Sequence, residues 1–257
     1  MLSFGYAFLY IPLVLVVVYS FNDSRIATVW GGFSTRWYSE LFRNDQILDA
    51  MFLSLRIAFT SATGATIFGT MAGLVLARFG RFRGRTFFSG MISSPMVMPE
   101  VITGLSLLLF FVALQQLTGW PGQRGFATIT IAHLTFSMAY VAVIVQSRLM
   151  SMDESLEEAA MDLGGRPLRV VFDITLPLIA PAMIAGWLLS FTLSLDDLVI
   201  ASFVSGPGSS TLPMLIFSKV KLGVSPDINA LATLIIAAVS LGVAIAWFVM
   251  KRATKPS

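Results

Sequence analysis

Residues 148–167 read RLMSMDESLEEAAMDLGGRP, and this stretch differs from the sequence on either side of it. Its acidic side chains are Asp153, Glu154, Glu157, Glu158 and Asp162. Its apolar residues recur at spacings of three and four, at Leu156, Ala159, Ala160 and Leu163. This pattern predicts a short amphipathic helix that Ser151 or Asp153 caps and Gly164-Gly165 ends. Helices that lie on membrane surfaces are usually basic, so we expect this acidic helix to dock on a protein.

The rest of the chain is strongly apolar. Of the 257 residues, 56% are hydrophobic and 12% are charged, and the mean hydropathy is +0.82. This composition excludes a disordered chain, a nucleic-acid-binding domain and an ordinary soluble enzyme, because the excess apolar surface must face lipid. With no cysteine and one histidine, the chain has no disulfide framework, no thiol chemistry and no histidine-rich metal site of its own.

Six stretches approach the roughly 20 apolar residues that a membrane-spanning helix needs. We expect them at 4–21, 53–77, 87–114, 126–145, 178–195 and 228–250. Pro95 and Pro99 interrupt the third, and glycines 64, 69 and 73 are expected contact points on the second. No basic residue precedes the first stretch, so we interpret it as a retained helix and not as a signal peptide. The prediction is a single all-α transmembrane domain over residues 1–257.

The basic residues of the short loops predict the orientation. One cluster, between the second and third spans, is Arg78, Arg81, Arg83 and Arg85, and another, after the sixth, is Lys251, Arg252 and Lys255. By the positive-inside rule both clusters are cytoplasmic. Both termini and the loop 148–177 are then cytoplasmic, and segments 22–52, 115–125 and 205–227 face outside.

The acidic loop also carries a recognisable motif. Glu158-Ala159-Ala160, three residues, Gly164, nine residues and Ile174-Thr175-Leu176-Pro177 resemble an E-A-A…G…I-x-L-P signature. That signature belongs to the permease subunits of ATP-binding-cassette (ABC) importers served by a solute-binding protein, the MetI-like inner-membrane components. Every fixed position is filled. The resemblance implies the type I ABC importer permease fold, with six transmembrane helices and a cytoplasmic coupling helix.

The resemblance also implies roles for the motif. Glu158 would contact donors in a groove of an ATPase subunit, Ala159 and Ala160 would allow close approach, and Gly164 would supply the turn. The remaining motif positions are Ile174, Leu176 and Pro177. The sequence has no G-x-x-x-x-G-K-[ST] phosphate loop, so we expect a transport subunit and not an enzyme.

The expected partners follow from the same resemblance. They are two ATP-binding subunits that hold ATP and Mg, a second homologous permease subunit, a periplasmic polyamine-binding protein and membrane lipid, with no nucleic acid. We expect no cofactor or metal in this chain itself.

Within that family the chain is similar to the polyamine permeases, and to the putrescine type above all. The segments that carry this likeness are 29–38, 98–106 and 194–203. They imply ATP-driven uptake of putrescine across the bacterial inner membrane, with spermidine or another small solute as the alternative.

Acidic residues within spans are costly and are therefore candidates for a substrate pathway. Glu100 follows the Pro99 break, so we expect it either to face the pore or to cap the helix that restarts there. Gly186, Ser190, Ser194 and Asp197 share one face of the fifth span, which suits a helix interface or a pore wall. We assign Asp197 to the pore side and Asp196 to anchoring the segment that follows.

Three further side chains in the spans each allow two interpretations. Trp187 and Tyr140 either make cation–π contacts with an ammonium group or pack against neighbouring helices. His133 is either a proton relay or, as we favour, a hydrogen-bond partner of a neighbouring helix.

Two other classes of protein are disfavoured. An ATP-independent secondary transporter would generally show an internal repeat and more spans. An intramembrane serine protease would need a serine on a glycine-rich turn, which residues 104–107 do not provide, and the acidic loop would have no role in it.

Overall fold

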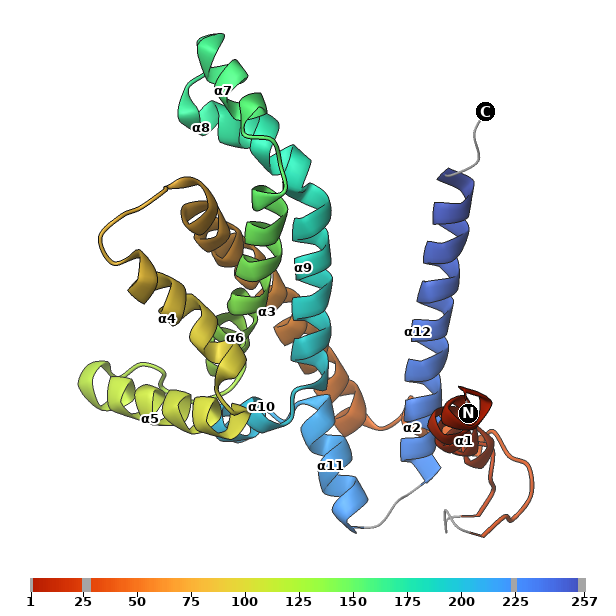
Figure 1. Cartoon of the computed structure of the whole chain (residues 1–257). Coiled ribbons are helices and arrows are strands. Elements are labelled where there is room, and N and C mark those ends of the chain that lie inside the picture. The colour runs from red at the N-terminus through yellow and green to blue at the C-terminus, as the bar shows by residue number, and fades with distance from the viewer. Residues whose placement is uncertain (1, 25–28, 223–225, 254–257) are drawn as a thin grey trace. The chain divides into compact units, whose positions relative to one another are not determined.

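The structure, a computed structural model, describes residues 2–24, 29–222 and 226–253 (Figure 1). Within these residues all regular secondary structure is helical, apart from an isolated bridge between Asn22 and Phe33. Contacts divide the chain into two compact units, residues 50–214 and residues 1–49 with 215–257. Residues 1, 25–28, 223–225 and 254–257, and with them Lys255 of the C-terminal basic cluster, lie outside the described residues, as do the side chains of Lys251 and Arg252.

The larger unit contains most of α3 and the elements from α4 to α10. Their bounds are α3 Asp45–Arg78, α4 Arg85–Val97, α5 Glu100–Thr118, α6 Phe126–Met150, α7 Ser155–Asp162, α8 Pro167–Val170, the π-helical turn η1 Val171–Thr175, α9 Leu176–Asp196 and α10 Val199–Val204. In Figure 1, α7 and α8 lie at one end of this unit, and α5 and α10 lie at the other.

Four helical segments are long and apolar enough to cross a membrane: Asp45–Arg78, Glu100–Thr118, Phe126–Met150 and Pro167–Asp196. The predicted helices at 53–77, 126–145 and 178–195 are confirmed as α3, α6 and α9. The first and last predicted helices correspond to α1 (Leu2–Tyr19) and α12 (Pro226–Ala253), whose apolar stretches among the described residues are shorter, Gly5–Tyr19 and Pro226–Leu241.

The expected break at Pro99 is confirmed, but the stretch 87–114 forms two separate helices and not one span. Met98 has an extended backbone (ψ 136°) and Pro99 has no N–H to continue the helical ladder, so α4 ends at Val97 and α5 begins at Glu100. In Figure 1, α5 lies beside α10 at the lower end of the larger unit and does not continue the direction of α4. Pro95, in contrast, lies inside α4 without ending it.

Small residues let the long helices of the larger unit approach closely. Val141 of α6 is fully buried between Gly69 of α3 and Gly186 of α9. A Cβ atom at Gly69 would lie 2.7 Å from Val141 Cβ, and one at Gly186 would lie 3.2 Å from Val141 Cγ1. A larger residue at Gly69 would force α3 and α6 to shift, and one at Gly186 would require Val141 to move slightly. The expected contact role of the α3 glycines is confirmed.

The smaller unit contains α1, α2 (Arg36–Leu41), the greater part of α11 (Leu212–Leu222) and α12. Its loop before α2 is held by the buried Trp37, whose indole N–H donates to the carbonyl of Asn22 at 2.6 Å. The Asn22 side chain in turn bonds the backbone of Val29 and Gly31, which fixes the loop ahead of α2.

Candidate functional site

The predicted amphipathic helix is present as α7, an eight-residue helix at one end of the larger unit. The N-cap residue is Glu154, which makes no side-chain cap bond, so the predicted cap by Ser151 or Asp153 is wrong. Asp153, one residue earlier, accepts the backbone N–H of Ser155 at 3.0 Å. This hydrogen bond, together with one from the Ser155 hydroxyl, lowers the pKa of Asp153 below its usual value. The helix ends where Gly164 adopts a φ of +88° and the Gly165 N–H returns to the carbonyl of Ala160 at 3.0 Å.

One acidic residue fastens α7 to the transmembrane helices. Arg78, the last residue of α3, donates from Nε to Glu157 Oε2 at 2.9 Å, and Thr175 of η1 donates its hydroxyl to Glu157 Oε1 at 2.8 Å. Arg78 also bonds Glu154 through Nη1 at 3.0 Å. The side chains of Arg78 and Glu157 are each 14% exposed, whereas that of Glu154 is 66% exposed. Glu157 is therefore the principal anchor.

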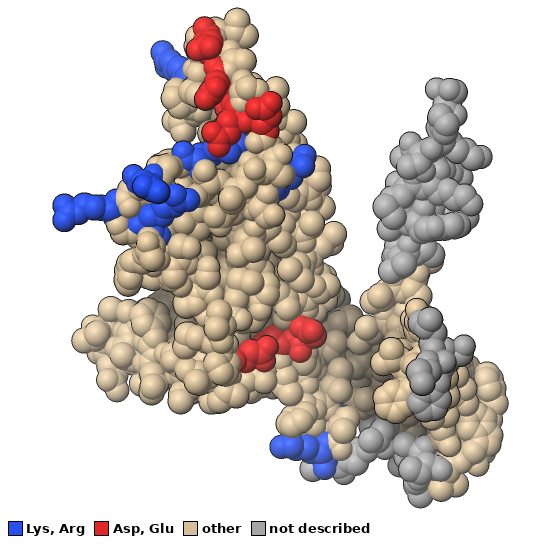
Figure 2. Space-filling model, viewed as in Figure 1, with Lys and Arg blue, Asp and Glu red and all other residues tan. Residues whose placement is uncertain are grey.

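The motif residues that directly follow Glu157 on α7 are more accessible than this anchor. Glu158 and Ala159 are exposed and Ala160 is half-buried. Beside them is a hollow of about 290 Å³ whose lining includes Ala160, Gly164 and Ile174. Large apolar side chains stand exposed around it, with Leu163 91% and Leu168 76% accessible. Figure 2 shows acidic side chains gathered over this end of the larger unit. Leu176 and Pro177 are the first two residues of α9.

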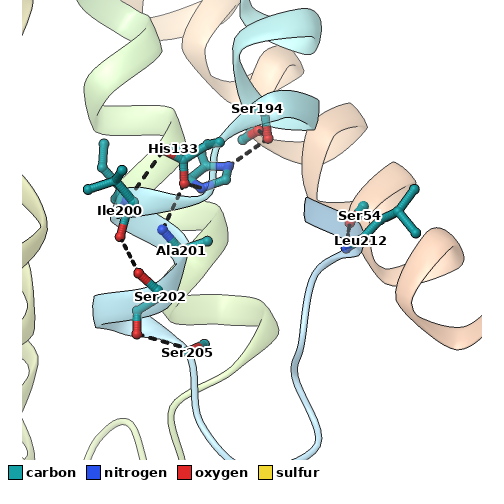
Figure 3. Close-up of polar contacts among 11 residues, drawn as sticks. Ser54, His133, Ser194, Ile200, Ala201, Ser202, Ser205 and Leu212 are labelled. Atoms are coloured by element: carbon teal, nitrogen blue, oxygen red, sulfur yellow. Dashed lines mark hydrogen bonds and ion pairs between the residues drawn. The ribbon is translucent and has the colours of Figure 1, made fainter. Parts of the chain in front are cut away.

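A buried polar network joins α3, α6 and α9 at the far end of α9 (Figure 3). His133 Nδ1 lies 2.6 Å from Ser194 Oγ, which also accepts a bond from the Ser61 hydroxyl at 3.2 Å. His133 Nε2 lies 3.1 Å from Asp197 Oδ2. His133 is 2% exposed, so the favoured interpretation, a hydrogen bond to a neighbouring helix, is confirmed.

The anchoring role expected of Asp196 belongs to Asp197 in this structure. Asp197 follows the end of α9 with an extended backbone, and its carboxylate accepts the N–H groups of Ile200 at 3.3 Å and Ala201 at 2.7 Å. It thereby anchors α10, the task expected of Asp196. Asp196 is instead exposed.

Four of the remaining pathway candidates are buried or half-buried in this structure: Ser190, Ser194, Trp187 and Tyr140. Ser190 and Ser194 are buried on the face of α9 that packs on α6. In this structure they therefore lie in a helix interface and not on a pore wall. Trp187 also packs, because its N–H donates to Thr63 Oγ1 at 3.1 Å and its ring stacks on Phe191. Tyr140 is half-buried beside Phe136.

Glu100 differs from these four residues, because no side chain in the described part of the chain neutralises its charge. It is the exposed first residue of α5, and among the described residues its carboxylate has no hydrogen-bond or ion-pair partner. Of the acidic candidates, Glu100 and Asp196 are the two whose side chains stand exposed.

Two features define the class of protein. Several helices are long and apolar enough to cross a membrane, and an anchored acidic helix exposes Glu158 and Ala159 of the motif. The family model for the binding-protein-dependent transport system inner membrane component matches residues 65–254. The chain belongs to this family and is a multi-pass inner-membrane protein.

Relatives and solved structures agree with that assignment. The chain is 62% identical over 254 residues to the putrescine transport system permease protein PotI of Escherichia coli (strain K12), covering 99% of this chain and 90% of PotI. It is 46% identical over 231 residues to the spermidine/putrescine transport system permease protein PotC of the same organism, covering 90% of this chain and 85% of PotC.

The fold is shared with more distant transporters. A chain of a bacterial ABC transporter involved in the import of the acidic polysaccharide alginate matches with a TM-score of 0.72 at 16% identity, over 99% of this chain and 94% of that one. A chain of the MetNI methionine ABC transporter matches with a TM-score of 0.64 at 15% identity, over 82% and 96%.

Proposed function

We propose that this chain is the permease subunit of an ATP-driven importer that takes up putrescine. The observation that carries the proposal is its 62% identity, over nearly its whole length, to a putrescine transport system permease. Spermidine is the second candidate, because a spermidine/putrescine permease is 46% identical over 90% of the chain.

In this proposal the two units form one permease domain with six membrane spans and both termini in the cytoplasm. The arginines that follow α3 support this orientation through the positive-inside rule. The cytoplasmic α7 fits a groove of an ATP-binding subunit, with Glu158 toward donors and the Ala159-Ala160 surface in close contact. Two such subunits bind ATP and Mg, and a second permease subunit and a periplasmic binding protein complete the importer.

The substrate pathway would use unpaired negative charge. A diamine carries two ammonium groups and little other polar surface, so a pathway needs carboxylates or aromatic faces that bind it weakly enough to release it. Glu100 and Asp196 meet this need best, because both are exposed. Asp197, Ser190, Ser194, Trp187 and Tyr140 would act by shaping the helices around the pathway.

Uptake of labelled putrescine tests this function in a strain that lacks its own putrescine permeases. We expect the chain, expressed with its partner subunits, to restore uptake, and an excess of unlabelled putrescine to compete more strongly than spermidine. Deleting the ATP-binding subunit should abolish uptake. If uptake is absent at normal membrane levels, or persists without the ATP-binding subunit, the proposal is wrong.

A further inference from the structure

A pocket of about 550 Å³ lies at the connection between α3 and α4. It is lined by Arg81, Phe82, Arg85, Thr86 and Ser89. The chain reverses tightly here because Gly80 and Gly84 have φ values of +60° and +88°. Figure 2 shows basic side chains gathered on this part of the larger unit.

The positive charge of the pocket is not neutralised by the described part of the chain. Arg81 is exposed and has no hydrogen-bond or ion-pair partner there. Arg85 donates from Nη2 to the carbonyl of Leu76 at 2.8 Å, which holds its guanidinium in place without supplying an opposite charge. The carboxylates that α7 brings to the end of α3, those of Glu154 and Glu157, are paired with Arg78. The pocket therefore favours an anion from outside the chain.

The surroundings of the pocket are those of a membrane boundary. Exposed aromatic residues alternate with the arginines: Phe79 is 68% and Phe87 is 73% accessible. The apolar surface continues along α4 through Met91 and Val97, 58% and 83% accessible. Arginine and aromatic side chains at the end of a spanning helix are placed at the level of lipid headgroups. An acidic protein surface would not account for the exposed rings.

We propose that this pocket binds the phosphate group of an anionic phospholipid. The two guanidinium groups would form charge-assisted hydrogen bonds with phosphate oxygens, and the hydroxyls of Thr86 and Ser89 would add neutral ones. The first turn of the 13-residue α4 adds the positive end of its dipole. Free inorganic phosphate offers the same oxygens, but only a lipid also covers the neighbouring aromatic side chains.

The chain contains a matched pair of variants for the test. Arg81→Gln removes a charge from the pocket, whereas Arg83→Gln removes the same charge from the same loop outside the pocket lining. Native mass spectrometry of the assembled importer, titrated with short-chain phosphatidylglycerol, measures binding. We expect Arg81→Gln to weaken binding about fivefold and Arg83→Gln to change it less than about twofold. Arg81→Lys should retain most of the affinity.

Three outcomes would overturn the proposal. Equal losses in Arg81→Gln and Arg83→Gln would indicate diffuse charge attraction and no defined pocket. Competition by inorganic phosphate as strong as that of phosphatidylglycerol would indicate a site for free phosphate. Unchanged lipid binding in Arg81→Gln, with loss of an ATP-binding subunit from the complex, would indicate a protein interface.

Discussion

Replacing Glu157 by glutamine should loosen α7 from the transmembrane helices. The change keeps the size of the side chain but removes the charge that Arg78 contacts at 2.9 Å and the carboxylate that accepts the Thr175 hydroxyl. Breaking one side of a fully buried ion pair costs about 3–5 kcal/mol. Because both side chains are 14% exposed and Arg78 keeps Glu154, we expect a loss of about 2 kcal/mol here.

Hydrogen exchange of the purified chain measures this loss. If α7 detaches by local opening, 2 kcal/mol corresponds to exchange about 30-fold faster over residues 155–163. Glu154→Gln is the matched control, since it removes a bond to the same arginine from a side chain that is 66% exposed. We expect it to accelerate exchange by no more than about fivefold. Exchange in Glu157→Gln within about twofold of the parent chain would refute the anchoring role of Glu157.

Three further predictions concern other parts of the molecule. Gly69→Val should lower the melting temperature of the detergent-purified chain, by overpacking worth about 1–3 kcal/mol against Val141, whereas Gly90→Ala, whose Cβ would meet nothing within 4 Å, should not. Because the pKa of Asp153 is lowered, its contribution to α7 is present above the ordinary carboxyl pKa and is lost as the pH falls through the lowered value. The amide of Ser155 should therefore keep its protection from pH 8 to about pH 5 and lose it only below about pH 4; loss at neutral pH would count against the hydrogen bond from Ser155 to Asp153. Glu100→Gln should reduce putrescine uptake at unchanged membrane levels, and equal uptake rates would remove Glu100 from the pathway.

The helical framework could be predicted from the sequence. A long apolar run is typical of a membrane-spanning helix, and a small residue within it is typical of a close helix contact, without reference to distant residues. The motif around Glu158 predicted a short helix, and Gly164 predicted its end. The separation of α4 from α5 was harder to predict, since two prolines lie close together and only Pro99 ends a helix. Which of the two prolines ends the helix depends on the extended backbone conformation of Met98, which the spacing of the prolines does not specify.

The anchor and the polar network could not be predicted, because their partners are far apart in the chain. Glu157 and Glu158 are adjacent carboxylates of equal chemistry, and only the positions of Arg78 and Thr175 distinguish them. The same holds for Asp196 and Asp197, of which Asp197 and not Asp196 anchors the segment that follows. The shared helical face of Asp197 with Ser194 was a usable signal, since it placed both near a neighbouring helix.

In the proposed function α7 passes force from an ATP-binding subunit to this chain, and transport by the complete importer in proteoliposomes tests this role most directly. We expect Glu158→Lys to reduce ATP-dependent putrescine uptake at least about tenfold at equal protein content, because it reverses the charge at the proposed contact. Uptake by Glu158→Lys at the parent rate, or uptake by the permease without ATP-binding subunits, would contradict the claim.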